Sequence, residues 1–121
     1  MSNTQRDTSK ATEAIKETRF VEALRLLKLN LEKDPNHIDS LYLAAVSSRY
    51  VKNYDDSKKY IEALLMNAPD MGRAYQELGH LSRDNGNEED AIRHYRQACE
   101  LNPALSSCWQ ALYNYFKKNK N

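Results

Sequence analysis

The three prolines of the chain are evenly spaced, and this spacing constrains the fold more than any other feature. Pro35, Pro69 and Pro103 follow one another at intervals of 34 residues, in the similar settings EKDPNH, MNAPDM and ELNPAL. A fixed period of this length is typical of a stacked repeat, in which each unit buries its apolar face against the next. We therefore expect a short array of similar units.

Other positions fall into register when the segments are aligned on the prolines. A small residue occupies one position of each unit, where two helices could cross closely, and a bulky residue follows four positions later. The small residues are Ala23, Ser57 and Ala91, and the bulky ones are Leu27, Ile61 and Tyr95.

Composition favours an all-α chain, since there are only three glycines and three prolines among many Ala, Leu, Glu, Lys and Arg residues. Apolar residues recur at intervals of three and four, as amphipathic helices require. We expect a disordered lead at residues 1–7. The expected helices span about 8–17, 20–33, 37–50, 54–67, 71–84, 88–101 and 105–118.

The third segment resembles the tetratricopeptide repeat (TPR), whose pattern is W-x2-L-G-x2-Y, then A-x3-F, then P. It departs from that pattern at Ser82, where an aromatic residue is expected. The matching residues are Tyr75, Leu78, Gly79, Ala91, Tyr95 and Pro103. The start of a fourth unit carries Trp109, Leu112, Tyr113 and Phe116.

This resemblance implies an all-α, right-handed α-solenoid of about three TPR units plus a C-terminal helix. The domain would cover residues 8–121. The expected units are 4–37, 38–71 and 72–105, followed by a terminal helix at 106–118.

Two of the three glycines have a structural explanation in this architecture. Gly79 lies where the two helices of a unit approach closely, so no side chain larger than alanine is expected to fit; Ala11 and Ala45 occupy this position in earlier units. Gly86 lies in the sequence DNGNEED, where Asn85 or Gly86 can adopt the left-handed conformation that ends a helix.

Charge and cysteine content exclude several classes of protein. Charged residues make up 29% of the chain but leave a net charge of +1, which argues against a nucleic-acid binder. No apolar run approaches the roughly 20 residues of a membrane span, and the start MSNTQRDTSK shows no secretory signal. Cys99 and Cys108 form no metal-binding motif, so we expect two reduced thiols in a cytoplasmic protein, with a disulfide as the minor alternative.

By resemblance, the first helix of each unit lines a concave face that binds a partner peptide. Tyrosine and arginine suit such a surface, because tyrosine supplies contact area and arginine binds carboxylates through forked hydrogen bonds. We expect an extended or helical peptide with an acidic group, held by Arg49, Arg73 and Arg83 and packed on Tyr42. The predicted groove residues are Tyr42, Val46, Arg49, Tyr50, Arg73, Gln76, His80, Arg83, Gln110 and Asn114.

One family subclass clamps the C-terminal carboxylate of a chaperone with Lys, Asn and Arg side chains. Of the residues at the matching positions, only Arg73 has the right character, and Glu77 would repel a carboxylate. We therefore do not expect a chaperone tail as the partner. The matching positions are Thr8, Thr12, Leu43, Arg73 and Glu77.

Catalysis has little support in the sequence, so we expect no enzyme, cofactor or metal site. His80 and His94 lie on different expected helices without a nucleophile beside them. The best-supported role is a protein-interaction module or scaffold. The alternatives are a regulatory or substrate-presenting domain of a larger enzyme, such as a bacterial TPR-sulfotransferase, and weak self-association through Tyr113, Tyr115 and Phe116.

Overall fold

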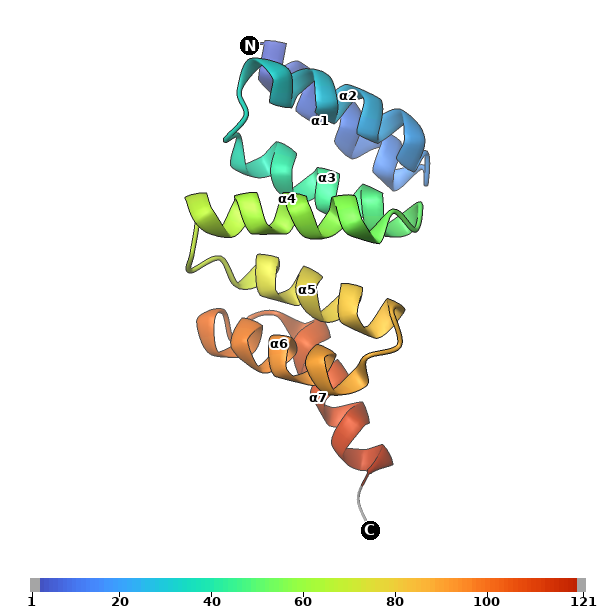
Figure 1. Ribbon diagram of the computed structural model, residues 1–121, viewed down its shortest axis with the longest axis vertical. Helices are drawn as coiled ribbons and strands as arrows, with labels where there is room; N and C mark the ends of the chain where they lie inside the picture. The colour runs from blue at the N-terminus through green and yellow to red at the C-terminus, as the bar shows by residue number, and fades with distance from the viewer. Residues whose placement is uncertain (1–2, 120–121) are drawn as a thin grey trace. The chain divides into compact units, whose positions relative to one another are not determined.

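The computed structural model describes residues 3–119, and these form seven α-helices without a strand among them (Figure 1). The expected all-α fold is thereby confirmed. Of the expected N-terminal lead, residues 1–2 lie outside the described part, and the first helix begins at Asn3, earlier than the sequence predicted. The helices are α1 (Asn3–Lys16), α2 (Phe20–Lys33), α3 (Ile38–Tyr50), α4 (Tyr54–Asn67), α5 (Gly72–Asp84), α6 (Glu88–Leu101) and α7 (Ser106–Lys118).

The chain folds as two compact units that meet in the sequence between Ala68 and Pro69. In the N-terminal unit, α1 packs on α2, α2 on α3 and α3 on α4 (Figure 1). In the C-terminal unit, α5 packs on α6 and α6 on α7. Neighbouring helices in the sequence are therefore neighbours in space within each unit, as helical hairpins require.

The turn inside each hairpin contains one residue in the left-handed region, and these residues also follow the 34-residue period. They are Thr18 (φ 59°), Lys52 (φ 66°) and Gly86 (φ 82°). In the second turn Asn53 N donates to Ser48 O at 2.8 Å, and in the third Asn87 N donates to Ser82 O at 2.8 Å. These bonds satisfy carbonyls at the end of the first helix. Only the third turn has the glycine that this conformation favours.

The second helix of the later hairpins begins with a repeated cap. Asn53 Oδ1 accepts from Asp56 N at 3.3 Å, and Asn87 Oδ1 accepts from Asp90 N at 3.1 Å. Acidic residues fill the first turn of both α4 and α6. They face the positive end of the helix dipole, which stabilises the helix start.

Buried polar groups link the helices of the N-terminal unit. Asn30 of α2 is fully buried, and its Nδ2 donates to Thr8 Oγ1 at 2.9 Å and to Ser40 Oγ at 3.1 Å. Ser57 Oγ donates to the Ala45 carbonyl at 2.8 Å, so a short side chain joins α4 to α3. The apolar core around them consists of Ala11, Ala14, Ala23, Leu26, Leu27 and Ala44.

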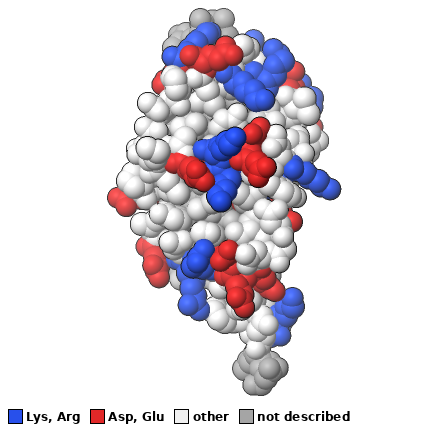
Figure 2. All heavy atoms as spheres, viewed as in Figure 1, with Lys and Arg blue, Asp and Glu red and all other residues white. Residues whose placement is uncertain are grey.

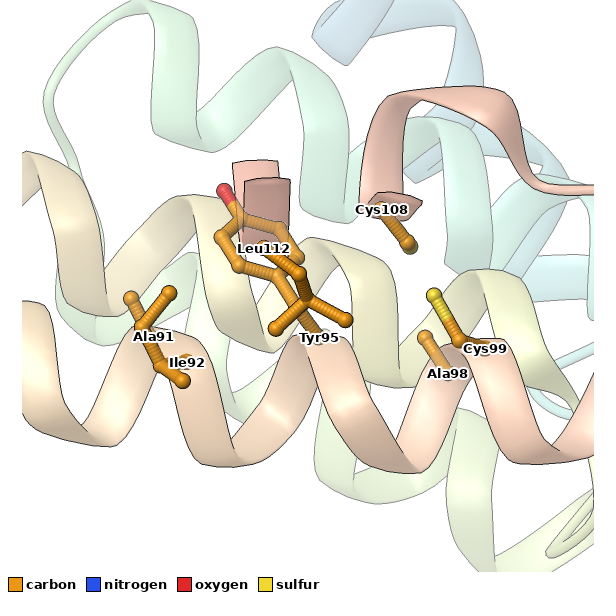
Figure 3. Close-up of a cluster of buried hydrophobic side chains, with 7 residues drawn as sticks. All are labelled: Ala91, Ile92, Tyr95, Ala98, Cys99, Cys108 and Leu112. Atoms are coloured by element: carbon orange, nitrogen blue, oxygen red, sulfur yellow. The ribbon is translucent and has the colours of Figure 1, made fainter. Parts of the chain in front are cut away.

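The core of the C-terminal unit is built around Tyr95, whose side chain is only 1% exposed. Its hydroxyl lies 2.7 Å from His80 Nδ1, so the buried phenol has a hydrogen-bond partner. Figure 3 shows the cluster, which consists of Ala91, Ile92, Tyr95, Ala98, Cys99, Cys108 and Leu112.

Gly79 lies directly against the Tyr95 ring. A Cβ atom at position 79 would lie 2.6 Å from Tyr95 Cε1 and 2.7 Å from Cδ1, closer than van der Waals contact allows. The sequence suggested that alanine would also fit at position 79, and this expectation is wrong for this unit. The two positions compensate for one another in size. The first unit pairs alanine with an aliphatic residue, as in Ala11 and Leu27, whereas this unit pairs glycine with the larger tyrosine.

We predict that Gly79→Ala destabilises the protein. Overpacking against a buried ring costs about 1–3 kcal/mol, and the higher helix propensity of alanine returns about 1 kcal/mol. The free energy of unfolding, measured by urea denaturation, should therefore fall by up to about 2 kcal/mol.

The matched partner change is Tyr95→Leu, which together with Gly79→Ala reproduces the pair of Ala11 and Leu27 found in the first unit. Alone it should destabilise by removing the ring and the His80 contact. Combined with Gly79→Ala it should cost less than the sum of the two single changes, since the alanine then has space. Additive losses would contradict the steric explanation.

Candidate functional site

The predicted groove residues of the N-terminal unit lie on α3. Tyr42 and Val46 are half-buried and one helical turn apart, so they share a face. Arg49 is only 7% exposed, and its Cζ lies 4.5 Å from the centroid of the Tyr50 ring. The guanidinium therefore contacts an aromatic face, and its role in binding a carboxylate stays a prediction.

Phe20 belongs to the same surface, although the sequence did not assign it a role in binding. Its ring stacks on Tyr50 with centroids 4.5 Å apart and planes 3° from parallel. Phe20 begins α2 while Tyr50 ends α3, so no spacing within one helix could have indicated the contact. Together Phe20, Arg49 and Tyr50 form a cation–aromatic cluster at the surface of this unit.

In the C-terminal unit, two predicted groove residues of α5 have structural contacts. Gln76 is buried and its Nε2 donates to Ser107 Oγ, which ties α5 to the start of α7. His80 is half-buried and contacts the Tyr95 ring edge-on, with centroids 5.4 Å apart, in addition to the hydrogen bond. Arg73, by contrast, is exposed.

The structure brings two further predicted residues together, although 31 positions separate them in the sequence. Arg83 at the end of α5 and Asn114 of α7 line the same pocket, which has a volume of about 210 Å³. We call it the polar pocket. Its lining consists of Arg83, Glu88, Ala91, Ile92, Tyr95, Ala111, Asn114, Tyr115 and Lys118.

The charges around the polar pocket are held by weak, exposed ion pairs. Lys118 Nζ lies 3.6 Å from Glu88 Oε2, and Arg83 Nε lies 3.6 Å from Asp84 Oδ1. Such pairs contribute little to stability, because water competes for both partners. A ligand carboxylate could therefore take the place of either partner carboxylate. Gln110 Nε2 donates to Asn114 Oδ1 at 3.0 Å and orients the Asn114 amide.

Sequence reasoning missed Glu88 and Lys118. Glu88 lies in the acidic first turn of α6, and Lys118 lies in the basic last turn of α7. A signal did exist for Lys118: it lies four residues after Asn114, and residues four apart share a helix face. The position of Glu88 depends on how α6 packs on α7, which spacing does not reveal.

The two cysteines lie in the buried cluster of the C-terminal unit. Both are buried free thiols, and Figure 3 shows their side chains pointing toward one another. Burial raises the pKa of Cys108 to about 12, and burial also raises the pKa of Cys99. Thiolate is the nucleophile and the metal ligand, so burial disfavours the reactive form of both thiols. Within residues 3–119 there is no cluster of three His, Cys, Asp or Glu side chains suited to a metal.

Charges of both signs are mixed on the face drawn in Figure 2, where blue and red side chains lie next to one another. This mixing agrees with the net charge of +1. None of the helices in the described part of the chain is long and apolar enough to cross a membrane.

Several known structures have the same fold as this chain. The first TPR domain of Spaghetti (RPAP3), solved with an HSP90 peptide, is 15% identical with a TM-score of 0.85, covering 98% of this chain and 94% of that chain. The chaperone SycD of Yersinia enterocolitica is 12% identical with a TM-score of 0.89, covering 100% and 98%. An O-GlcNAc transferase of Thermobaculum terrenum is 20% identical with a TM-score of 0.86, covering 96% and 23%. These likenesses show the fold.

The chain is thus an all-α protein with the TPR fold. Residues 72–105 match the family model of the tetratricopeptide repeat, and they coincide with the third unit expected from the proline spacing. The resemblance inferred from the sequence is confirmed. No curated protein matches the chain.

The raised pKa of Cys108 predicts a loss of stability at alkaline pH. The folded state keeps the thiol protonated, whereas the unfolded thiol ionises above about pH 8.5. The contribution of the Cys108 thiol to the free energy of unfolding is therefore complete below that pH. It is lost as pH rises toward 12, at first by roughly 1 kcal/mol per pH unit. Urea denaturation with reductant at pH 7, 8.5 and 9.5 should show this slope, and Cys108→Ala should reduce it. Parallel pH profiles would disprove the assignment.

Proposed function

We propose that this chain is a protein-interaction module, or scaffold, that binds a partner segment carrying an acidic group. The polar pocket carries this proposal. It collects a guanidinium, an ammonium and an amide, from Arg83, Lys118 and Asn114, beside the half-buried ring of Tyr115.

The chemistry of the pocket suits a carboxylate. Arginine donates two parallel hydrogen bonds to a carboxylate, lysine adds a point charge, and the amide can donate a further hydrogen bond. The pocket lining contains two cations and one anion, Glu88, and the second paired anion, Asp84, lies outside the lining, so a negative ligand would enter by exchange with these carboxylates. Because the existing ion pairs are exposed and weak, their exchange for a ligand carboxylate costs little.

The remaining predicted residues extend the proposed surface along α5 and, separately, on α3. Arg73, Gln76, His80 and Arg83 are spaced by three and four residues, so they lie on one face of α5, where Arg73 and Arg83 are exposed and Gln76 is buried against Ser107. A segment whose carboxylate sits in the polar pocket could continue along this face toward Arg73. On the N-terminal unit, Tyr42 and Val46 offer a second face with an aromatic contact.

Peptide binding by a relative supports the class of partner but not its identity. Spaghetti was solved with the HSP90 peptide SRMEEVD. We propose a different partner for this chain, because Thr8, Thr12 and Leu43 provide no cation at the clamp positions and Glu77 is buried. The free thiols agree with a cytoplasmic location, where cysteines remain reduced. We propose neither nucleic acid nor membrane as a partner.

A peptide library displayed on phage and selected against the protein tests this proposal. Peptides enriched on the wild type should carry Asp or Glu. The double variant Arg83→Ala, Lys118→Ala should bind them at least tenfold more weakly, since a hydrogen bond to a charged group contributes about 1.5–3 kcal/mol. Isothermal calorimetry measures the change.

Arg93→Ala is the matched control. Arg93 is exposed on α6, pairs with Asp90 at 3.2 Å and does not line the polar pocket. Its removal should leave affinity unchanged. Enriched peptides without acidic residues, or equal losses in the control, would refute the proposal.

A second candidate is a regulatory or substrate-presenting domain of a larger enzyme. The match to the O-GlcNAc transferase favours it, because this chain aligns with only 23% of that protein. A bacterial TPR-sulfotransferase is the other enzyme of this kind that we propose. Sequencing the flanking gene segments is the test: an adjoining transferase domain would support this role, and stop codons on both sides would contradict it.

A further inference from the structure

The C-terminal unit contains a second hollow of very different character. It lies between α6 and α7 and has a volume of about 490 Å³. We call it the aromatic groove. Its lining consists of Arg96, Cys99, Glu100, Trp109, Leu112, Tyr113 and Phe116.

Three aromatic rings in the groove remain open to solvent. Trp109 is 51% exposed, Tyr113 is 61% exposed and Phe116 is 46% exposed. They are spaced by four and three residues, so they form one continuous stripe along α7. A contiguous apolar patch of a few hundred Å² is comparable to the largest patch on a typical monomer, and such patches are often functional.

The repeat register explains why the stripe is apolar. Trp109 and Tyr113 occupy the positions that Tyr75 and Gly79 occupy on α5. There, Tyr75 packs against the α6–α7 core and Gly79 lies under the Tyr95 ring. The face of α7 that an adjacent helix covers in the preceding repeat is therefore the face that stays open in the groove.

We propose that a second copy of this chain occupies the aromatic groove, with the α7 helices of the two copies paired about a two-fold axis. The three rings of the stripe line one side of the groove, and their exposed parts also form a raised edge next to it. A two-fold rotation brings the ridge of each copy into the groove of the other, so one surface serves as both partners.

The charges at the rim favour a second copy over a charged peptide. Arg96 and Glu100 lie one turn apart on α6, one positive and one negative. The Arg96 guanidinium lies 5.0 Å from the centroid of the Phe116 ring, and in the proposed two-fold arrangement it would also pair with Glu100 of the other copy. A uniformly acidic or basic segment would instead meet a like charge at one of the two positions.

The exposed area indicates a weak dimer. Three half-exposed rings offer roughly 300 Å² per copy, and the pair remains below the roughly 1,200 Å² of a stable specific complex even with part of the rim added. We therefore expect a dissociation constant on the order of 100 μM.

Trp109 is the only tryptophan of the chain and lies in the groove, so its emission reports on the proposed contact. From about 5 μM to 1 mM the emission should shift to the blue, in parallel with a monomer–dimer transition in analytical ultracentrifugation. A monomer throughout this range would overturn the proposal.

Tyr113→Lys should abolish the transition, because it places two like charges in the contact. Val21→Lys is the matched control: Val21 is 74% exposed on α2, in the other unit, and its change should leave the dimer intact. Circular dichroism verifies that both variants are folded, and Phe116→Ser replaces Tyr113→Lys if that variant is not. An unaffected dimer in a folded groove variant would overturn the proposal.

A charge exchange tests the two-fold pairing itself. Arg96→Glu alone should weaken the dimer about tenfold, and adding Glu100→Arg should restore most of the affinity. A double variant no tighter than the single one would overturn the arrangement. Arg83 lines the polar pocket and not the aromatic groove, so Arg83→Ala should weaken peptide binding and leave dimerisation unchanged. The two proposals can therefore fail independently of one another.

Discussion

The structure depends on the close crossing of the two helices in each hairpin. In the third repeat Gly79 lies against the ring of Tyr95, and the added Cβ of any other residue would overlap that ring. In the second repeat the Ser57 hydroxyl reaches the Ala45 carbonyl at 2.8 Å, which also requires a short distance between the helices. Small residues permit this approach, and the bulky residues beside them fill the volume that remains.

The large ring of Tyr95 also shapes the surface of the C-terminal unit. It lines the polar pocket, and its hydroxyl orients His80, so that this histidine has a structural partner. Helix α7 then presents two faces. Asn114 and Lys118 border the polar pocket, whereas Trp109, Tyr113 and Phe116 border the aromatic groove. One helix thus contributes to both proposed binding surfaces, and different chemistry separates their ligands.

Local features of the chain were predictable to within a residue for six of the seven helices. Prolines, asparagine caps and apolar spacing each act over a few residues, so the helix limits can be predicted from the sequence alone. The left-handed turn was recognised only at Gly86. Thr18 and Lys52 adopt the same conformation because the flanking helices impose it, and their side chains give no signal of it.

The sequence by itself determined the class of fold, the repeat length and the limits of the helices, because these follow from periodicity and local hydrogen bonding. Only the tertiary structure decided which polar side chains meet. The contact of Phe20 with Tyr50 and the gathering of Arg83, Glu88 and Lys118 join residues on different helices. Their distances depend on how far each helix is rotated and displaced as it packs, and that depends on the volumes of buried side chains such as Tyr95.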